Sequence, residues 1–409
     1  MSQYHLSDMS ITREHTSVRP ISLWQLLISM LRVGSVSFGG YMALVSILRD
    51  ELVDRRQVLK DEVILDAVAL ASVFPGPLAV NIVIYVGYKL RGKVGMLIAF
   101  AGILLPAFVL VCILTYVYFE YGDVLYLEPI FKGVMPAVAA IILSVAIKMT
   151  KTHIRHWVQV ILLLISVAAL LIFSGFKIII LLMAGGAILG YLFFRGVQHS
   201  EDLEVPGPRI RGRDLRMMGT SLAGVAAVLL VLALFGEDIL PLQLITVFST
   251  MSLSLFGGGY VFIPMMQEVV VESLGWLTNA EFIDGIALGQ VSPGPIMISS
   301  VFIGYKVMGF PGTLIATVAM FLPSGILMVV GSRLILSYSD SVLFKSAMKG
   351  VYAVTIGMIF SACLNIGMDL EMNLISVSIF LISALCLIRY KVNLVYVVLS
   401  AGLAGSLLM

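Results

Sequence analysis

The sequence predicts an all-α integral membrane protein with an inverted internal repeat, in which broken or re-entrant helices carry FGG and PGP motifs. Composition is the first reason, because 60% of the 409 residues are hydrophobic, only 12% are charged, and the mean hydropathy is +1.05. A soluble domain carries about 25% charged residues. Apolar runs such as 96–117 match the thickness of a bilayer core. We therefore expect a multi-pass protein of the cell membrane.

The repeat is the second reason. The sequence SFGGY around Phe38 returns 218 residues later as LFGGGY around Phe256. Fixed offsets of 218 and then 217 residues relate further positions, and these matches fall on Gly, Pro and charged residues rather than on interchangeable apolar ones. The paired positions are Asp66 with Asp284, Pro75-Gly76-Pro77 with Pro293-Gly294-Pro295, Gly87-Tyr88-Lys89 with Gly304-Tyr305-Lys306, and Pro106 with Pro323.

Each repeat contains the same order of apolar segments. One broken by glycines comes first, followed by one broken by Pro-Gly-Pro, two unbroken segments and two shorter ones. The segments are 21–48, 62–88, 94–119, 130–149, 158–173 and 176–194 in the first repeat, and 241–266, 282–305, 313–332, 346–366, 374–388 and 391–408 in the second.

This order predicts five parts along the chain. They are a polar N-terminal tail (1–20), a first transmembrane repeat (21–194), a cytoplasmic linker rich in Arg and Pro (195–217), a connecting transmembrane helix (218–235) and a second, inverted transmembrane repeat (236–409).

The distribution of charge is the reason for expecting inversion. Lys and Arg collect in short cytoplasmic loops. Loops 49–61 and 89–93 of the first repeat hold seven of them, whereas the equivalent loops 267–281 and 306–312 hold only Lys306. Opposite charge bias implies opposite orientation, and the single span between the repeats supplies the required reversal.

Two arrangements of the Pro-Gly-Pro segments remain open. Loops 49–61 and 89–93 are both positive although a broken segment separates them. This favours a re-entrant segment, because two arms of about 11 residues, roughly 17 Å each, reach only the middle of the bilayer. The alternative is that every broken segment spans the membrane and that the motifs are kinks.

The interrupted backbone indicates an anion site. Irregular backbone inside a membrane must be buried in protein or line a wet cavity, and a helix beginning there directs free N–H groups and a positive dipole end at a ligand. The plainer interpretation is that these Gly and Pro residues only allow packing or kinks. The candidate substrate-binding positions are Ser37, Phe38, Gly39, Gly40, Pro75, Gly76, Pro77, Phe256, Gly257, Gly258, Pro293, Gly294 and Pro295.

A few polar side chains extend this candidate site. Arg32 would neutralise a bound anion, although it would equally serve as a structurally paired or snorkelling residue. Asn81 and Gln290 flank the two breaks and would donate to anion oxygens or to neighbouring helices. Asp66 and Asp284 are candidates for proton coupling, with helix capping as the alternative.

These motifs resemble the chromate transporter family in its long, two-domain form. The resemblance rests on GSVSFGG (34–40), RDELVDRR (49–56), DAVALASVFPGP (66–77) and DGIALGQVSPGP (284–295). It implies a transporter of the bacterial cytoplasmic membrane for oxyanions, with chromate as the named substrate and sulfate as a close mimic. Efflux coupled to protons or to the membrane potential is also implied.

The function expected is therefore secondary active transport of a small inorganic oxyanion. An anion channel using the same donors is the alternative. A membrane-embedded enzyme is disfavoured, because the chain lacks an HExxH motif, paired carboxylates on one helix and a Ser/His arrangement. The expected partners are the oxyanion, the lipid bilayer and a second copy of the chain as a homodimer. We expect no nucleic acid, no cofactor and no metal.

Overall fold

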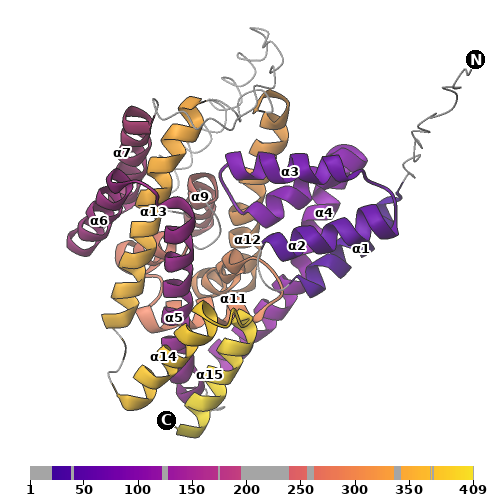
Figure 1. The fold of residues 1–409 in the computed structure, drawn as a ribbon. Coiled ribbons are helices and arrows are strands. Elements are labelled where there is room, and N and C mark those ends of the chain that lie inside the picture. Colours follow the sequence, from indigo (N-terminus) through magenta and orange to yellow (C-terminus); the bar gives the residue numbers. More distant parts are fainter. Residues whose placement is uncertain are drawn as a thin grey trace, which may run out of the picture.

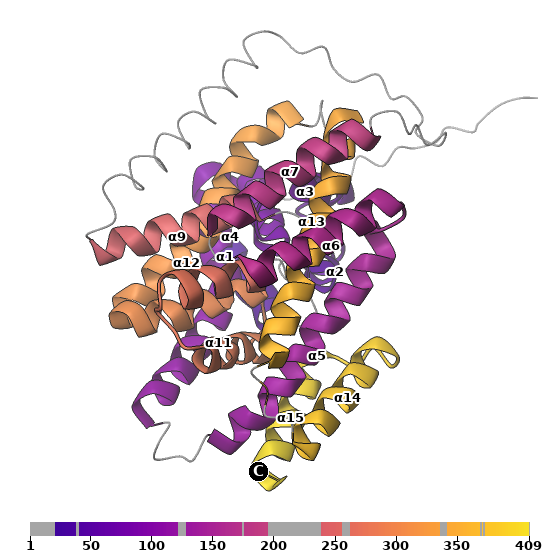
Figure 2. The same ribbon diagram turned by 90° about the vertical axis from the view of Figure 1, so that its left-hand side faces the viewer.

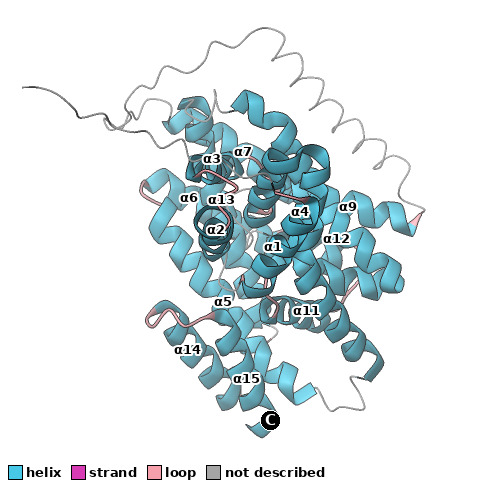
Figure 3. Cartoon of the chain, turned by 90° about the vertical axis from the view of Figure 1, so that its right-hand side faces the viewer, coloured by secondary structure: helices cyan, strands magenta, loops and turns pink. Residues whose placement is uncertain are grey.

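The computed structural model describes residues 21–37, 41–121, 128–173, 176–194, 239–255, 262–335, 342–368, 370 and 373–408. These residues form helices joined by short loops, without a strand among them (Figure 3). The predicted tail (1–20), the linker (195–217) and the connecting helix (218–235) lie outside the described residues.

Two series of helices follow the chain (Figure 1). In the first repeat they are α1 (Leu23–Val36), α2 (Tyr41–Arg49), η1 (Asp50–Arg55), α3 (Asp61–Val73), α4 (Leu78–Tyr121), α5 (Glu128–His153), α6 (Trp157–Ile172) and α7 (Phe176–Phe194). In the second they are α9 (Leu240–Ser254), α10 (Phe262–Gln267), η3 (Glu268–Ser273), α11 (Asn279–Val291), η4 (Ile296–Ser299), α12 (Ser300–Ile335), α13 (Val342–Met368), α14 (Leu374–Ile388) and α15 (Leu394–Leu408).

The described helices have the length and surface of a membrane protein. Four of them are long and apolar enough to cross a bilayer, namely 78–121, 129–153, 296–332 and 346–368. Large apolar side chains also stand on the outer surface, among them Trp24, Ile172 and Leu374. Such a surface is stable against lipid and not against water. The expectation of an all-helical, multi-pass membrane protein is confirmed.

The Pro-Gly-Pro motifs interrupt helices as the sequence predicts. The first motif separates α3 from α4, and the second separates α11 from η4 and α12. The second repeat is one residue shorter between this motif and Gly304. A 3₁₀ turn rises about 2.0 Å per residue against about 1.5 Å in an α-helix. The four 3₁₀ residues of η4 therefore span the same distance with one residue fewer.

Both long helices bend at equivalent residues, 217 positions apart. In α4 the backbone leaves helical geometry at Arg91 and at Gly92, where φ is +61°. In α12 it does so at Met308 and at Gly309, where φ is +63°. Glycine adopts this left-handed conformation without the strain that a Cβ would impose. These bends divide each long element into the two apolar segments expected from the sequence.

The two repeats exchange their last two helices. Helices α6 and α7 pack against α13 of the second repeat, whereas α14 and α15 pack against α5 of the first (Figure 2). Glycines stand at the closest approaches, with Gly350 against Gly186 and Gly133 against Gly405. Small residues allow helix backbones in membranes to approach this closely. Helix α13 of the second repeat is therefore covered by helices of the first, and α5 of the first repeat is covered by helices of the second.

Candidate functional site

The first Pro-Gly-Pro break is packed directly against the second repeat. The Gly76 N–H donates to the Leu255 carbonyl at 2.7 Å, which places this break next to the end of α9. Gly76 has a φ of +115°, and a Cβ built on it would overlap the Ser324 side chain and lie 2.9 Å from Asn81 Nδ2. Glycine is therefore required here both by the backbone conformation and by the close contact with α12.

A chain of buried polar groups holds this break. Asn81 is fully buried; its Nδ2 donates to the Pro75 carbonyl at 3.1 Å, and its Oδ1 accepts from Ser324 Oγ at 3.1 Å. Ser252 Oγ donates to Ser324 Oγ at 3.1 Å. Sequence reasoning found Asn81 but missed both serines. A comparison of the repeats would have indicated both serines. Ser252 stands at the position equivalent to Gly34, and Ser324 stands at the position equivalent to Ala107, which have no hydroxyl.

The second break lies reciprocally against the first repeat. A Cβ on Gly294, where φ is +156°, would lie 3.1 Å from the Ala107 Cβ of α4. Ala107 and Ser324 are equivalent positions, so each break contacts the same point on the opposite repeat. Two donors near this break, Gln290 Nε2 and Ser300 Oγ, are buried without a hydrogen-bond partner among the described residues.

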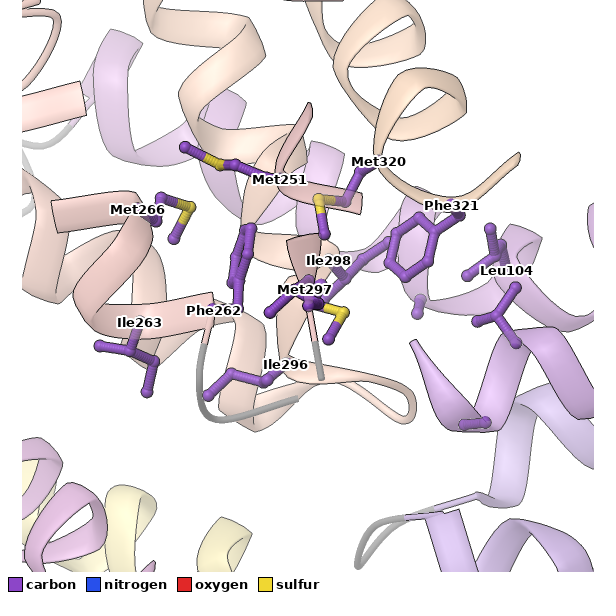
Figure 4. Close-up of a cluster of buried hydrophobic side chains, with 14 of the residues drawn as sticks. Leu104, Met251, Phe262, Ile263, Met266, Ile296, Met297, Ile298, Met320 and Phe321 are labelled. Atoms are coloured by element: carbon purple, nitrogen blue, oxygen red, sulfur yellow. The ribbon is translucent and has the colours of Figure 1, made fainter. Parts of the chain in front are cut away.

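Apolar side chains surround the second break. Figure 4 shows Ile296, Met297 and Ile298 of η4 packed among side chains of other helices, including Met320 and Phe321 of α12. A hydrogen bond between a ligand and a polar group in such apolar surroundings is stronger than the same bond in water, because the local dielectric constant is low.

Of the two glycine motifs, the structure describes only the flanking residues. Residues 38–40 and 256–261, which include Phe38, Gly39, Gly40, Phe256, Gly257 and Gly258, lie outside the described residues. The preceding Ser37 is buried, and its hydroxyl donates to the Val33 carbonyl at 2.5 Å. Leu255 is the last described residue before the second motif, and its carbonyl accepts the hydrogen bond from the Gly76 N–H.

The structure places Arg32 in an ion-pair cluster with a glutamate. Arg32 Nη1 and Arg55 Nη1 donate to Glu51 Oε2 at 3.4 and 3.2 Å. Arg56 Nε and Ser29 Oγ donate to Glu51 Oε1 at 2.7 and 3.1 Å. Burial raises the pKa of the Glu51 carboxyl, but the hydrogen bonds from Arg56 and Ser29 outweigh it and hold that pKa below its usual range. The described contacts of Arg32 therefore agree with the structurally paired alternative.

The two repeat-related aspartates have different surroundings. Asp66 is exposed, whereas Asp284 is only 6% exposed. Tyr118 Oη of α4 donates to Asp284 Oδ2 at 2.8 Å, and Asp284 Oδ1 is buried without a hydrogen-bond partner among the described residues. The residue equivalent to Tyr118 is Ile335, which has no hydroxyl. Sequence reasoning treated the aspartates as a pair and missed Tyr118.

A described cavity lies apart from the Pro-Gly-Pro breaks. It encloses about 290 Å³, including the space open to solvent, between α6, α10, η3 and α13. Glu268 and Glu272 line it, together with Gln267, Ser361 and Asn365. Carboxylates repel an oxyanion, so this cavity is not assigned to one. The described residues contain no group of three or more His, Cys, Asp or Glu side chains arranged to hold a metal ion.

Comparisons with known proteins agree with this architecture. A family model described as chromate transporter matches residues 24–191 and 242–406. The chain is 30% identical over 389 residues to an uncharacterized transporter of Methanocaldococcus jannaschii, covering 95% of each chain. It is 30% identical over 369 residues to a probable chromate transport protein of Synechococcus elongatus, covering 90% of this chain and 89% of that protein. It is 28% identical over 371 residues to a chromate transport protein of Cupriavidus metallidurans, with the same coverage.

No solved structure matches the chain. The two regions that match the family model coincide with the two repeats and leave out the stretch between them. Because they span most of the sequence, the chain belongs to the chromate transporter family.

Proposed function

We propose that this protein is a secondary active transporter of a tetrahedral oxyanion, with chromate as the principal substrate and sulfate as a mimic. The observation that supports this most is the packing of each Pro-Gly-Pro break against the opposite repeat. Two interrupted helices then meet at the interface between the repeats, which is where transporters built from repeats bind their substrates. The names of the relatives support chromate as the substrate class.

The repeats are inverted in this proposal. Reciprocal contacts, in which equivalent residues meet on both sides, are what a two-fold axis produces. The contacts of Gly76 with Ser324 and of Gly294 with Ala107 follow this rule, as do the exchanged terminal helices. The opposite charge of equivalent loops supports an axis that lies in the membrane plane. Residues 195–217 would lie in the cytoplasm, and residues 218–235 would cross the membrane once.

Re-entrant breaks are also part of the proposal. Helices α3 and α11 each contain 13 residues, or about 20 Å at 1.5 Å per residue. That length reaches beyond the middle of a bilayer core of about 30 Å but does not cross it. Each Pro-Gly-Pro turn would then lie near the midplane.

Neutral donors would bind the anion. The unpartnered Gln290 Nε2 and Ser300 Oγ provide two of them near the second break, and the backbone N–H groups of the glycine motifs would provide others. Arg32 remains a candidate on the cytoplasmic approach, but it would have to exchange Glu51 for substrate. Two negative charges leaving a cell whose interior is negative gain roughly 4.6 kcal/mol per 100 mV, so the membrane potential would favour efflux.

A flux assay on the purified full-length protein in proteoliposomes tests this function. We expect saturable chromate flux, with competition by sulfate and no single-channel currents. Discrete currents would favour the anion channel instead. Flux of a cation or neutral solute, with none for any tetrahedral oxyanion, would refute the proposal. A second copy of the chain is a further proposed partner, which the molecular mass in detergent would test.

A further inference from the structure

We propose that Asp284 is the proton-binding group of the transport cycle and that Tyr118 of the opposite repeat positions it. This inference rests on the proposed function and deepens it, because it assigns coupling to one aspartate of the pair. It depends on the burial of Asp284, on its hydrogen bonding and on the difference between the two repeats.

The first step is the cost of an ionised carboxylate at this position. Asp284 is 6% exposed in α11, a helix inside the bundle. A buried charge needs partners for all its polar atoms. Only one carboxylate oxygen has a described hydrogen bond, the one donated by Tyr118 at 2.8 Å. A neutral, protonated carboxyl retains this bond and removes the uncompensated charge, so the described packing suits the protonated state.

The second step concerns the charged groups nearby. Glu281 lies one turn earlier on the same helix, but Lys306 Nζ of α12 pairs with it at 2.7 Å. Lys306 is therefore engaged elsewhere and does not neutralise Asp284. Tyr118 of α4 is the titratable group that bonds directly to the carboxylate. Ionisable carboxyl groups inside a membrane protein that have no cationic partner commonly mark proton pathways.

The third step is the position of the pair. Tyr118 belongs to the first repeat and Asp284 to the second, so their hydrogen bond crosses the interface between the repeats. Tyr118 is itself held edge-on against Phe131 and Phe302, at ring-centroid distances of 5.1 Å each. Movement of one repeat against the other would change this bond and hydrate the carboxylate. Proton binding at Asp284 is thereby linked to the movement that carries the anion.

The experiment uses full-length protein in proteoliposomes, with the membrane potential held at zero and a pH gradient imposed. Two activities are measured for labelled chromate, namely net flux driven by the gradient and one-for-one exchange, which moves no net proton. We expect Asp284→Asn to lose the gradient-driven flux by at least about tenfold while retaining exchange, as expected when only the proton-linked step is blocked. Asp66→Asn is the matched control from the other repeat and should retain both.

A second variant separates positioning from folding. Tyr118→Phe keeps the ring and removes the hydroxyl, so exchange should persist while the midpoint of the pH profile moves by roughly one unit, the equivalent of one hydrogen bond. Gradient-driven flux in Asp284→Asn, or the same loss in Asp66→Asn, would overturn the inference. So would an unchanged pH profile in Tyr118→Phe. Wild-type protein that moves no oxyanion would instead refute the proposed function.

Discussion

Replacing Gly76 by alanine tests the close packing of the first break. The new Cβ would come closer than 3.0 Å to both side-chain atoms of Ser324, in a conformation with a φ of +115°. Backbone strain contributes about 1–3 kcal/mol, overpacking about 1–3 kcal/mol, and distortion of the hydrogen bond to Leu255 about 1 kcal/mol. We therefore expect a loss of about 3–7 kcal/mol in unfolding free energy, together with loss of transport.

Two further variants separate these contributions. Gly92→Ala also places a side chain at positive φ, but its Cβ meets nothing within 4 Å, so it should cost only the strain. Ser324→Gly removes the overlapping atoms, so the double variant Gly76→Ala/Ser324→Gly should be more stable than the sum of the single effects predicts. The unfolding free energies of the three single variants and of the double variant are measured in detergent, with a fused fluorescent protein reporting unfolding. If Gly76→Ala lowers the unfolding free energy no more than Gly92→Ala does, the first break is not closely packed against α12, and the prediction is refuted.

Three other predictions concern separate parts of the molecule. Single cysteines at Gln57 and Thr278 should be labelled by impermeant reagents from opposite sides of the membrane, and labelling from one side would exclude the inverted repeat. Ser324→Ala should cost about 1–2 kcal/mol because Asn81 loses its donor, whereas Ser252→Ala leaves that bond intact and should cost less in the same unfolding assay. The pKa of Glu51 is lowered in the folded protein. Its contribution to the unfolding free energy is therefore fully present above the ordinary glutamate pKa of about 4.3, and it is lost as the pH falls through the lower pKa of the folded state. Glu51→Gln should therefore reduce stability at pH 7 and flatten the pH dependence of unfolding below about pH 4.3, and an unaltered acid transition would contradict the cluster.

Parts of the candidate site were predictable because they are local. Proline lacks a backbone donor, so the breaks at 75–77 and 293–295 follow from residue type alone. Asn81 was also predictable, as a polar residue beside such a break. The two serines and Tyr118 were not, because their partners lie tens to hundreds of residues away along the chain. The charge of Arg32 is likewise visible in the sequence, whereas its pairing with Glu51 is not.

The sequence by itself determined that the chain is a helical membrane protein with two related halves, where its helices break, and to which family it is similar. Hydrophobicity, proline chemistry and residue identity are properties of the chain that need no coordinates. Only the tertiary structure decided that each break packs on the opposite repeat, that the terminal helices are exchanged, and that Asp284 is buried against Tyr118 while Asp66 is exposed. Burial and long-range hydrogen bonding depend on which helices meet, so two aspartates at equivalent positions acquire different chemistry from their different neighbours.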